Sequence, residues 1–281
     1  MSSSGFVTGA IFAVLTCLVL CLPASVYFYK GYRRRQWYQR ITRATVESPD
    51  TASHGETALV RAPVYTDSET TSPLSGEDVA VTAWQVSEYM NTSNGWTYKM
   101  RGATIGDARL EGEATAVALP TIHTNTEVDG VLRGTRLSDI TDRSVATDRV
   151  RFETTDHGTD VEYNPGDSLP EHIAEFERRV GLDPAEKHSV VDIMRHDGAR
   201  RYVETAIEPG ETVTVFGTVT APDAPGDAPT LTPPDTGQLL VTRLGPAALA
   251  RRYRWGYWLA LYGVGGIVLL FSALMGYVGY L

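Results

Sequence analysis

Two long stretches without a charged side chain stand at the two ends of this chain, and they constrain its fold more than any other feature. Residues 2–29 and residues 255–281 contain no Asp, Glu, Lys or Arg. A helix of ~20 mostly apolar residues is long enough to cross the ~30 Å hydrocarbon core of a bilayer. The sequence therefore predicts two transmembrane helices. A cleaved signal peptide is the alternative for the first run, but there the positive charge follows the apolar core instead of preceding it.

Basic residues follow the first run directly and precede the second run directly. Lys and Arg that flank a transmembrane helix are retained on its cytoplasmic side. The pattern therefore predicts a two-pass protein of the cell membrane, with the region between the spans in the cytoplasm and both termini outside. The lipid bilayer is the first expected partner. The predicted topology anchors are Lys30, Arg33, Arg34, Arg35, Arg251, Arg252 and Arg254.

The acidic residues are confined to the middle of the chain. All 34 Asp and Glu lie between Glu47 and Asp235, and the whole chain has only three lysines. An acidic, lysine-poor surface keeps a protein solvated at multimolar salt, where charges are screened within ~3 Å. The composition is typical of a halophilic protein, so the acidity does not indicate a basic partner. It argues against nucleic-acid binding, which needs a basic surface.

Side chains that carry chemistry are scarce and poorly placed for it. The two cysteines, Cys17 and Cys21, lie inside the first apolar run, so the central region offers no thiol nucleophile or zinc finger. None of the six histidines has a partner at metal-ligand spacing. No nucleophile elbow or phosphate-binding loop is present. We therefore expect no catalytic residue, no metal and no cofactor.

The central region predicts a mainly β domain over residues 55–245. Residues 57–65 and 79–89 alternate apolar and polar side chains with the period of a strand and are rich in β-branched residues. Residues 150–168 and 200–222 each predict a β-hairpin around a glycine-containing turn. Residues 102–147 are expected to form long loops and irregular strands.

Two helices are expected between these hairpins. The first has Ser168 as its N-cap and Gly181 as its terminator, and the second runs from Asp183 to Gly198. The expected fold is an antiparallel, barrel- or sandwich-like β domain with a short helical insertion, together with two transmembrane helices. The expected parts of the chain are transmembrane helix 1 (5–29), a basic juxtamembrane segment and linker (30–54), the β domain (55–245), the start of a juxtamembrane helix (246–254) and transmembrane helix 2 (255–281).

Four stretches carry a resemblance to a known family. They are SPLSGEDVAVTAWQV, VRFETTDHGTDVEYNP, RRYVETAIEPGETVTVFGTV and LLVTRLGPAALARRYRWGYW. In this order they resemble the GIDE domain, which is shared by prokaryotic two-span membrane proteins and by a mitochondrial family of membrane E3 ubiquitin ligases. The ligase members resemble this chain through the second span and then add a RING finger. A RING needs Cys and His zinc ligands. Residues up to Leu281 do not contain that constellation, so the resemblance does not extend to ligase activity.

The resemblance implies a membrane-anchored interaction or sensing module without catalytic activity of its own, bound to a protein partner. Two alternatives stay open, an accessory role in a ubiquitin-like protein conjugation system and a scaffold for membrane-protein quality control. Loops carry function more often than packed strands do, so two turns are the expected interaction loops. Their residues are Ser72, Pro73, Ser75 and Gly76 in SPLSG, and Asp156, His157 and Gly158 in DHG.

Overall fold

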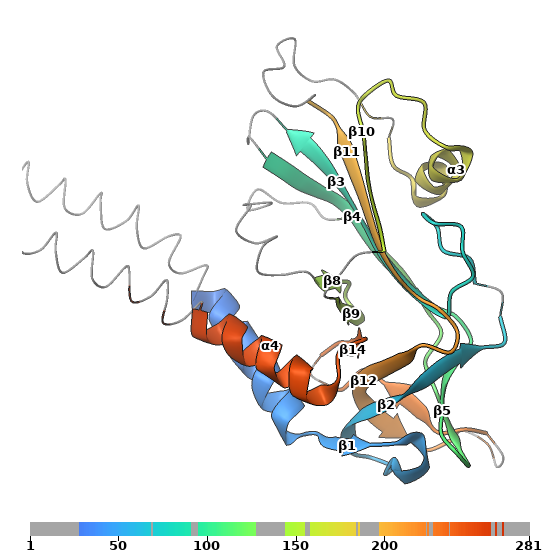
Figure 1. Ribbon diagram of the computed structural model, residues 1–281, viewed down its shortest axis with the longest axis vertical. Helices are drawn as coiled ribbons and strands as arrows, with labels where there is room; N and C mark the ends of the chain where they lie inside the picture. The colour runs from blue at the N-terminus through green and yellow to red at the C-terminus, as the bar shows by residue number, and fades with distance from the viewer. Residues whose placement is uncertain are drawn as a thin grey trace, which may run out of the picture. The chain divides into compact units, whose positions relative to one another are not determined.

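The computed structural model describes residues 28–259, 262 and 266, except residues 69, 91–94, 128–143, 155–157, 184, 186–196, 223, 225–226 and 236. Contacts within the chain divide it into two units (Figure 1). We call the first the helix unit, made of Met1–Arg43 and Pro246–Leu281, and the second the β unit, Ala44–Gly245. Each is described by itself.

The predicted pair of transmembrane helices is contradicted. Across the described parts of the chain, no helix is both long enough and apolar enough to cross a bilayer. The predictions of a two-pass architecture and of a cell-membrane localisation are therefore corrected. Residues 28–43 are helical and hold six Lys or Arg, and α4 (Pro246–Trp258) holds three Arg. Such side chains are costly in hydrocarbon. Most of the two apolar runs, 5–29 and 255–281, lies outside the described residues.

Five strands of the β unit close into a barrel. They pair in the order β2 (Thr57–Thr66), β5 (Ala108–Glu111), β6 (Ala116–Ala118), β13 (Thr230–Thr232) and β12 (Thr212–Thr220), and β12 also pairs with β2. The strands bury alternate side chains: Val60 and Val64 of β2 and Val213 and Val215 of β12 are fully enclosed. This alternation is the pattern that predicted β2, and it fills the barrel with branched apolar side chains.

The same sheet extends beyond the barrel on two sides. β1 (Thr45–Glu47) lies parallel to β2 and is followed by a 3-10 turn, η1 (Pro49–Thr51). On the other side β14 (Leu239–Thr242) pairs with β12, β9 (Val150–Glu153) lies parallel to β14, and β8 (Ser144–Ala146) pairs with β9.

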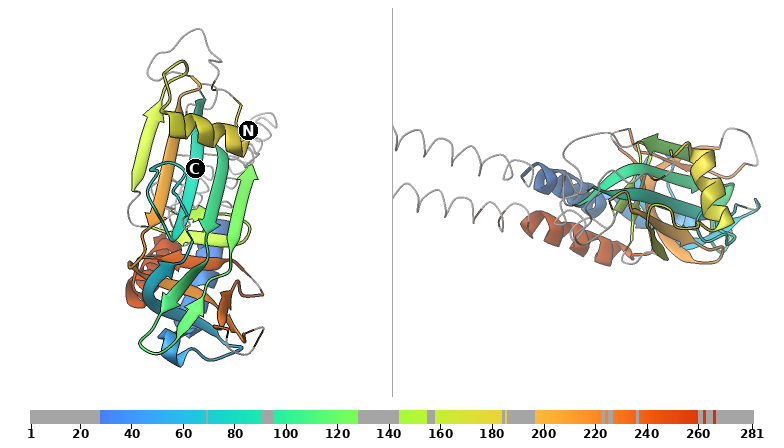
Figure 2. Two further views of the ribbon diagram at one scale, coloured as in Figure 1. Left: turned by 90° about the vertical axis from the view of Figure 1, so that its right-hand side faces the viewer. Right: turned by 90° about the horizontal axis from the view of Figure 1, so that it is seen from above.

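A second sheet of five antiparallel strands completes the β unit (Figure 2). Its order is β10 (Thr159–Tyr163), β11 (Arg200–Ile207), β3 (Val81–Met90), β4 (Gly95–Ile105) and β7 (Ile122–Glu127). One face is covered by α3 (Glu171–Val180), whose Phe176 ring meets the Trp84 ring edge-on at 4.7 Å between centroids. We call this the helix-covered face, and the other the open-sheet face.

The predicted first helix is confirmed, but its predicted N-cap is wrong, because Pro170 and not Ser168 caps it. Most of the second helix lies outside the described residues. α3 begins at Glu171 after Pro170, and it ends at Gly181, whose φ of 75° is left-handed. Ile173 and Phe176, expected on one face, are buried. Residues 184 and 186–196, which were expected to form the second helix, are not described.

Both predicted hairpins are wrong, because their strands belong to different sheets. β9 pairs with β14 and β8, whereas β10 pairs with β11. β11 pairs with β10 and β3, whereas β12 pairs with β2, β13 and β14. The turn between β11 and β12 was predicted correctly: Glu211 N–H donates to the Glu208 carbonyl at 3.2 Å, and Gly210 has a φ of 90°. A tight turn therefore reverses the chain without keeping its two strands in one sheet.

Candidate functional site

The helix unit pairs residues 28–43 with α4 along one stripe of side chains. Trp37 and Tyr253 are buried with ring centroids 6.1 Å apart, and Tyr38 lies 5.4 Å from Tyr257. Buried residues recur at the helical spacing of three and four, with Ile41 following Trp37 and Tyr253 following Leu249. Arg34 lies against Gly256 whereas Trp37 lies against Tyr253, so a higher residue number in one helix meets a lower one in the other, and the two helices are antiparallel.

One arginine lies in the contact between these helices. A Cβ added at Gly256 would come within 2.8 Å of Arg34 Nη1 and 2.9 Å of Arg34 Cδ. The absence of a side chain at Gly256 therefore makes room for the Arg34 side chain along α4. On the same helix as Arg34, the Arg40 guanidinium lies over the Trp37 ring, 5.7 Å from its centroid, which is a cation–π distance.

The outer surface of the helix unit is aromatic. Trp255 is 71% exposed and Tyr29 62%. Nine large hydrophobic side chains are exposed among the described residues, and all but two are in the helix unit. They are Phe28, Tyr29, Tyr32, Trp255, Trp258, Leu259 and Tyr262. Exposed apolar patches of this kind mark interaction sites in monomeric proteins.

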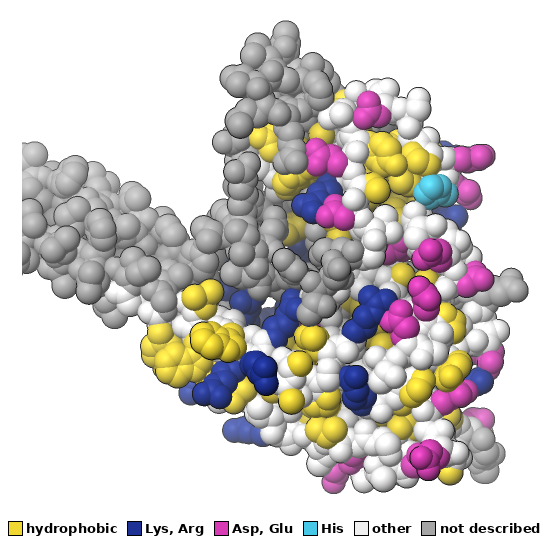
Figure 3. All heavy atoms as spheres, viewed as in Figure 1, with side chains coloured by type: hydrophobic (Ala, Val, Ile, Leu, Met, Phe, Trp, Pro, Cys, Tyr) yellow, Lys and Arg dark blue, Asp and Glu magenta, His cyan; other side chains and the backbone are white. Residues whose placement is uncertain are grey.

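The same helices carry charge of a single sign. Residues 28–43 and 246–262 contain nine Lys or Arg and no Asp or Glu. The other 16 of the 25 basic residues and all 34 acidic residues belong to the β unit. Figure 3 shows dark blue and yellow side chains next to one another where Figure 1 draws the described helices. We call these aromatic and basic side chains the aromatic–arginine surface.

All seven predicted topology anchors lie in the helix unit. Their predicted role in membrane topology is wrong, because it depended on the two-pass architecture. Arg33, Arg35, Arg251 and Arg254 are exposed. The other three, Lys30, Arg34 and Arg252, are half-buried. The structure brings the two clusters, more than 200 residues apart in the sequence, onto one pair of helices.

The predicted interaction loop SPLSG is held down onto the β unit by a buried carboxylate. Ser72 Oγ donates to Glu204 Oε2 at 2.5 Å, and the Ser75 backbone N–H donates to the same oxygen at 3.0 Å. Thr82 Oγ1 donates to Glu204 Oε1 at 2.7 Å. Burial raises the pKa of Glu204, although the hydrogen bonds from Ser72 and Thr82 favour its ionised form.

The remainder of the SPLSG loop is also fixed in place. Leu74 is buried in the apolar cluster that contains Trp84 and Phe176. Pro73 is half-buried, and Gly76 is exposed with a φ of 76°. This loop is therefore part of the packing under α3, and only its tip faces solvent.

The predicted DHG turn is described only in part. Asp156 and His157 lie outside the described residues, and Gly158 is exposed just before β10. Gly158 is not one of the glycines with a positive φ in the described chain, so it does not supply the left-handed conformation that a tight turn uses. Gly158 precedes Thr159, the register partner of Glu204, and Glu204 is the residue whose carboxylate holds the SPLSG loop.

A second buried polar cluster ties α3 to the helix-covered face. Arg200 Nη1 donates to Glu177 Oε1 at 2.6 Å, and Arg200 Nε donates to Glu88 Oε2 at 3.1 Å. Tyr202 Oη donates to Glu177 Oε1 at 2.5 Å. Burial lowers the pKa of Arg200, but Glu177 and Glu88 outweigh it and the net shift is upward. Burial, followed by the hydrogen bond to Glu177, raises the pKa of Tyr202 well above its usual range.

Sequence reasoning missed Glu204 and Arg200, although one signal was available. β11 alternates, and Arg200, Tyr202 and Glu204 fall on the same face of that strand. A charged residue two positions from a buried aromatic residue of the same strand points to the same face, which indicates a buried, hydrogen-bonded charge. The partners could not be found this way, because Ser72 is 132 residues from Glu204 in the sequence.

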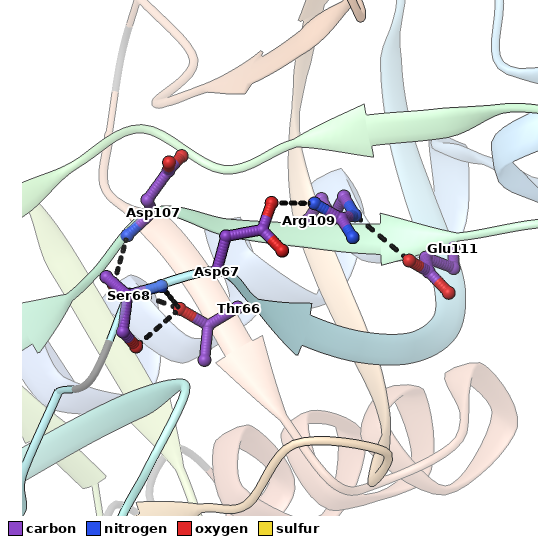
Figure 4. A network of polar contacts seen from close by, with 6 residues as sticks. All are labelled: Thr66, Asp67, Ser68, Asp107, Arg109 and Glu111. Carbon is purple, nitrogen blue, oxygen red and sulfur yellow. Dashed lines mark hydrogen bonds and ion pairs between the residues drawn. The ribbon is translucent and has the colours of Figure 1, made fainter.

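A third polar network lies at the surface where β2 ends and β5 begins (Figure 4). Arg109 pairs with Asp67 and with Glu111, and its Nε donates to Glu111 Oε1 at 2.9 Å. The Asp107 backbone N–H donates to Ser68 Oγ at 3.2 Å, and Ser68 N–H donates to Thr66 Oγ1 at 3.2 Å. These contacts join residues of the network to one another, so the network holds the end of β2 against the start of β5.

No group of three or more His, Cys, Asp or Glu side chains able to hold a metal is found in the described portions of the chain. The comparisons with known proteins give no relative: no family model matches the chain, and neither a curated protein nor a solved structure matches it. The resemblance to the GIDE domain stays a prediction.

Proposed function

We propose that this chain is a binding module that uses the aromatic–arginine surface of its helix unit to dock an acidic partner protein. The observation that carries this proposal is the coincidence of seven exposed large hydrophobic side chains with an unbroken basic charge on the same helices. Trp, Tyr and Arg are the residue types that dominate the binding energy of protein interfaces.

The positive charge of the aromatic–arginine surface favours a partner protein with an acidic surface. Nine basic side chains without an acidic one create a positive potential, which attracts and orients a surface rich in Asp and Glu. Charge complementarity supplies rate and orientation more than affinity. The exposed rings of Trp255 and Trp258 would supply the affinity by filling an apolar groove in the partner.

These two contributions respond differently to salt. At 1 M salt the Debye length is ~3 Å, so attraction between exposed charges is largely lost. Burial of aromatic surface is not screened. We therefore expect binding to slow in high salt while the complex, once formed, persists.

Site-specific photocrosslinking on the full chain tests the proposal. A benzophenone amino acid at position 255 is compared with the same group at position 46, because Val46 is 63% exposed but belongs to the β unit. We expect one discrete protein adduct from position 255, absent from position 46 and lost when Arg251 and Arg254 are replaced by Ser. Equal adducts at both positions, or none at 255, would contradict the proposal.

The GIDE resemblance, an accessory role in protein conjugation and a quality-control scaffold stay predictions. An adduct whose partner is a ubiquitin-like modifier or a conjugating enzyme would favour the second of these.

A further inference from the structure

Three polar side chains share the open-sheet face. They are Gln85, Arg101 and Thr124, from the adjacent strands β3, β4 and β7. Gln85 of β3 lies directly opposite Arg101 of β4, and Arg101 lies opposite Thr126 of β7. Thr124 is two residues from Thr126, so its side chain falls on the same face, diagonal to Arg101. The next pair along the ladder, Val86 and Met100, packs in the cluster beneath α3, so Gln85 and Arg101 point the opposite way.

Two buried atoms of this group lack a hydrogen-bond partner. Arg101 Nε and Thr124 Oγ1 are both enclosed and unpartnered in the part of the chain that the structure describes. The Arg101 guanidinium lies over the Tyr98 ring, with Cζ 4.0 Å from the ring centroid. That contact stabilises the cation from its face and uses none of its N–H donors.

Most other half-buried or buried arginines of the β unit have a carboxylate partner, although Arg61 has the Thr214 hydroxyl instead, to which its Nη1 donates at 3.0 Å. Arg200 is paired with Glu88 and Glu177, and Arg151 with Glu153. Even the more exposed Arg109 and Arg243 have carboxylates. Arg101 has no carboxylate within ion-pair distance among the residues that are described, in a unit where 34 acidic side chains outnumber 16 basic ones.

A buried donor without a partner is costly, and a buried charge more so. A guanidinium stacked on a ring still presents a planar fork of N–H groups, and this fork matches a carboxylate with two parallel hydrogen bonds. The Thr124 hydroxyl and the Gln85 amide could donate to the same anion. Since the surrounding unit is acidic, a singly charged anion is repelled less than a doubly charged phosphate.

We propose that Arg101, held by Tyr98 and flanked by Gln85 and Thr124, is the binding site for the carboxylate of a small ligand. This site belongs to the β unit alone. It is independent of the aromatic–arginine surface, and failure of either proposal leaves the other intact.

The Nε–H resonance of Arg101 gives a direct test on the full chain labelled with ¹⁵N-arginine. The resonance is assigned by its loss in Arg101→Lys. Acetate is titrated against chloride at constant ionic strength, with inorganic phosphate as the competing probe. We expect a saturable shift of the Arg101 signal with acetate, and an affinity about tenfold lower in Thr124→Val because one charge-assisted hydrogen bond is lost. The Arg109 signal serves as the internal control, since Asp67 and Glu111 already occupy its donors.

A thermal-unfolding experiment separates a binding role from a structural one. Arg101→Met removes an unpaired charge, so we expect its unfolding midpoint without acetate to equal or exceed that of the wild type. Acetate should raise the midpoint of the wild type and not that of the variant. A midpoint that falls in Arg101→Met as far as in Arg200→Met would make Arg101 structural. An Arg101 signal that does not saturate with acetate, or that responds more strongly to phosphate, would overturn the proposal.

Discussion

The Trp84 indole of β3 lies directly over Gly102, its register partner in β4: a Cβ at Gly102 would come within 2.2 Å of the Trp84 ring atom Cζ2. The ring fills the space that a side chain at position 102 would take, and it meets the Phe176 ring of α3 edge-on. We expect Gly102→Ala to destabilise the β unit by ~1–3 kcal/mol or more, because extra volume in a packed core forces side chains off their rotamers. Urea unfolding followed by tryptophan fluorescence measures it.

Gly158→Ala is the matched control for that change. A Cβ there would have as its nearest neighbour the Glu204 carbonyl oxygen at 3.9 Å, which is an ordinary contact. Its effect should stay within ~0.5 kcal/mol, as for surface substitutions in general. Equal costs for the two glycines would show that Trp84 does not require the space at Gly102.

Glu204 holds the SPLSG loop, so its neutral replacements should release that loop. Glu204→Leu leaves the hydroxyl groups of Ser72 and Thr82 without an acceptor, and each buried donor that loses its acceptor costs ~1–3 kcal/mol. The Ser75 N–H then has only Ser72 Oγ as its acceptor, at 3.0 Å. Glu204→Gln keeps one acceptor oxygen and should cost less. Hydrogen exchange of the Ser75 amide should quicken in both variants. The exposed Glu208 provides Glu208→Gln as a control, in which the Ser75 amide should exchange as in the wild type.

Removing Arg200 should be among the most damaging single changes in the β unit. It would leave the buried Glu177 without its ion-pair partner and Glu88 with Lys99 alone, and removing one partner of a buried ion pair costs ~3–5 kcal/mol. Arg200→Met tests this by chemical denaturation. Arg179→Ala is the comparison, because Arg179 and Glu175 form an exposed pair one helical turn apart, worth ~0–1 kcal/mol. Similar costs for the two arginines would mean that the Arg200 cluster is solvated.

Local features of this fold could be predicted from the sequence, and pairing between distant segments could not. The alternation in β2 and β3 and the apolar spacing in α3 depend on neighbours a few residues away. The turn at Pro209–Gly210 was evident for the same reason. The two strands that flank this turn do not pair with each other. β11 pairs with β3 and β12 pairs with β2, and both of these partners lie more than a hundred residues earlier in the chain.

The candidate sites also combine local features, which the sequence shows, with contacts between distant segments, which it does not. The arginine clusters and aromatic side chains at the two chain ends stand out in the sequence, but their placement together on one helix pair comes from the Trp37–Tyr253 contact. Arg101 resembles any solvent-facing arginine of an alternating strand. In the structure Arg101 is half-buried, contacts the Tyr98 ring and lies near a register shift between Val86 and Ser87, and none of these features is visible as a local pattern.

Asp50 links η1 to the turn between β5 and β6 through its carboxylate. Oδ2 accepts the backbone N–H of Glu113 at 2.9 Å, and Oδ1 accepts those of Ala114 at 2.9 Å and Thr115 at 2.8 Å. These hydrogen bonds, that of Ala114 first, lower the pKa of Asp50 from 3.8 to about 2. Because the folded pKa is depressed, the stabilisation is complete above the unfolded pKa and is lost as the pH falls through the folded one.

The Asp50 carboxyl carbon should therefore titrate by NMR with a midpoint at about 2, and the amides of Ala114 and Thr115 should lose protection over the same pH range. Asp50→Asn keeps one neutral acceptor, so it should weaken the protection of these amides at pH 5 and make it independent of pH between 5 and 2. Asp107→Asn is the control, since the exposed Asp107 carboxylate points away from its neighbours (Figure 4). If Asp50 titrated near 3.8, or if Asp107→Asn had the same effect on the turn, the backbone N–H groups would not be what holds the Asp50 carboxylate ionised.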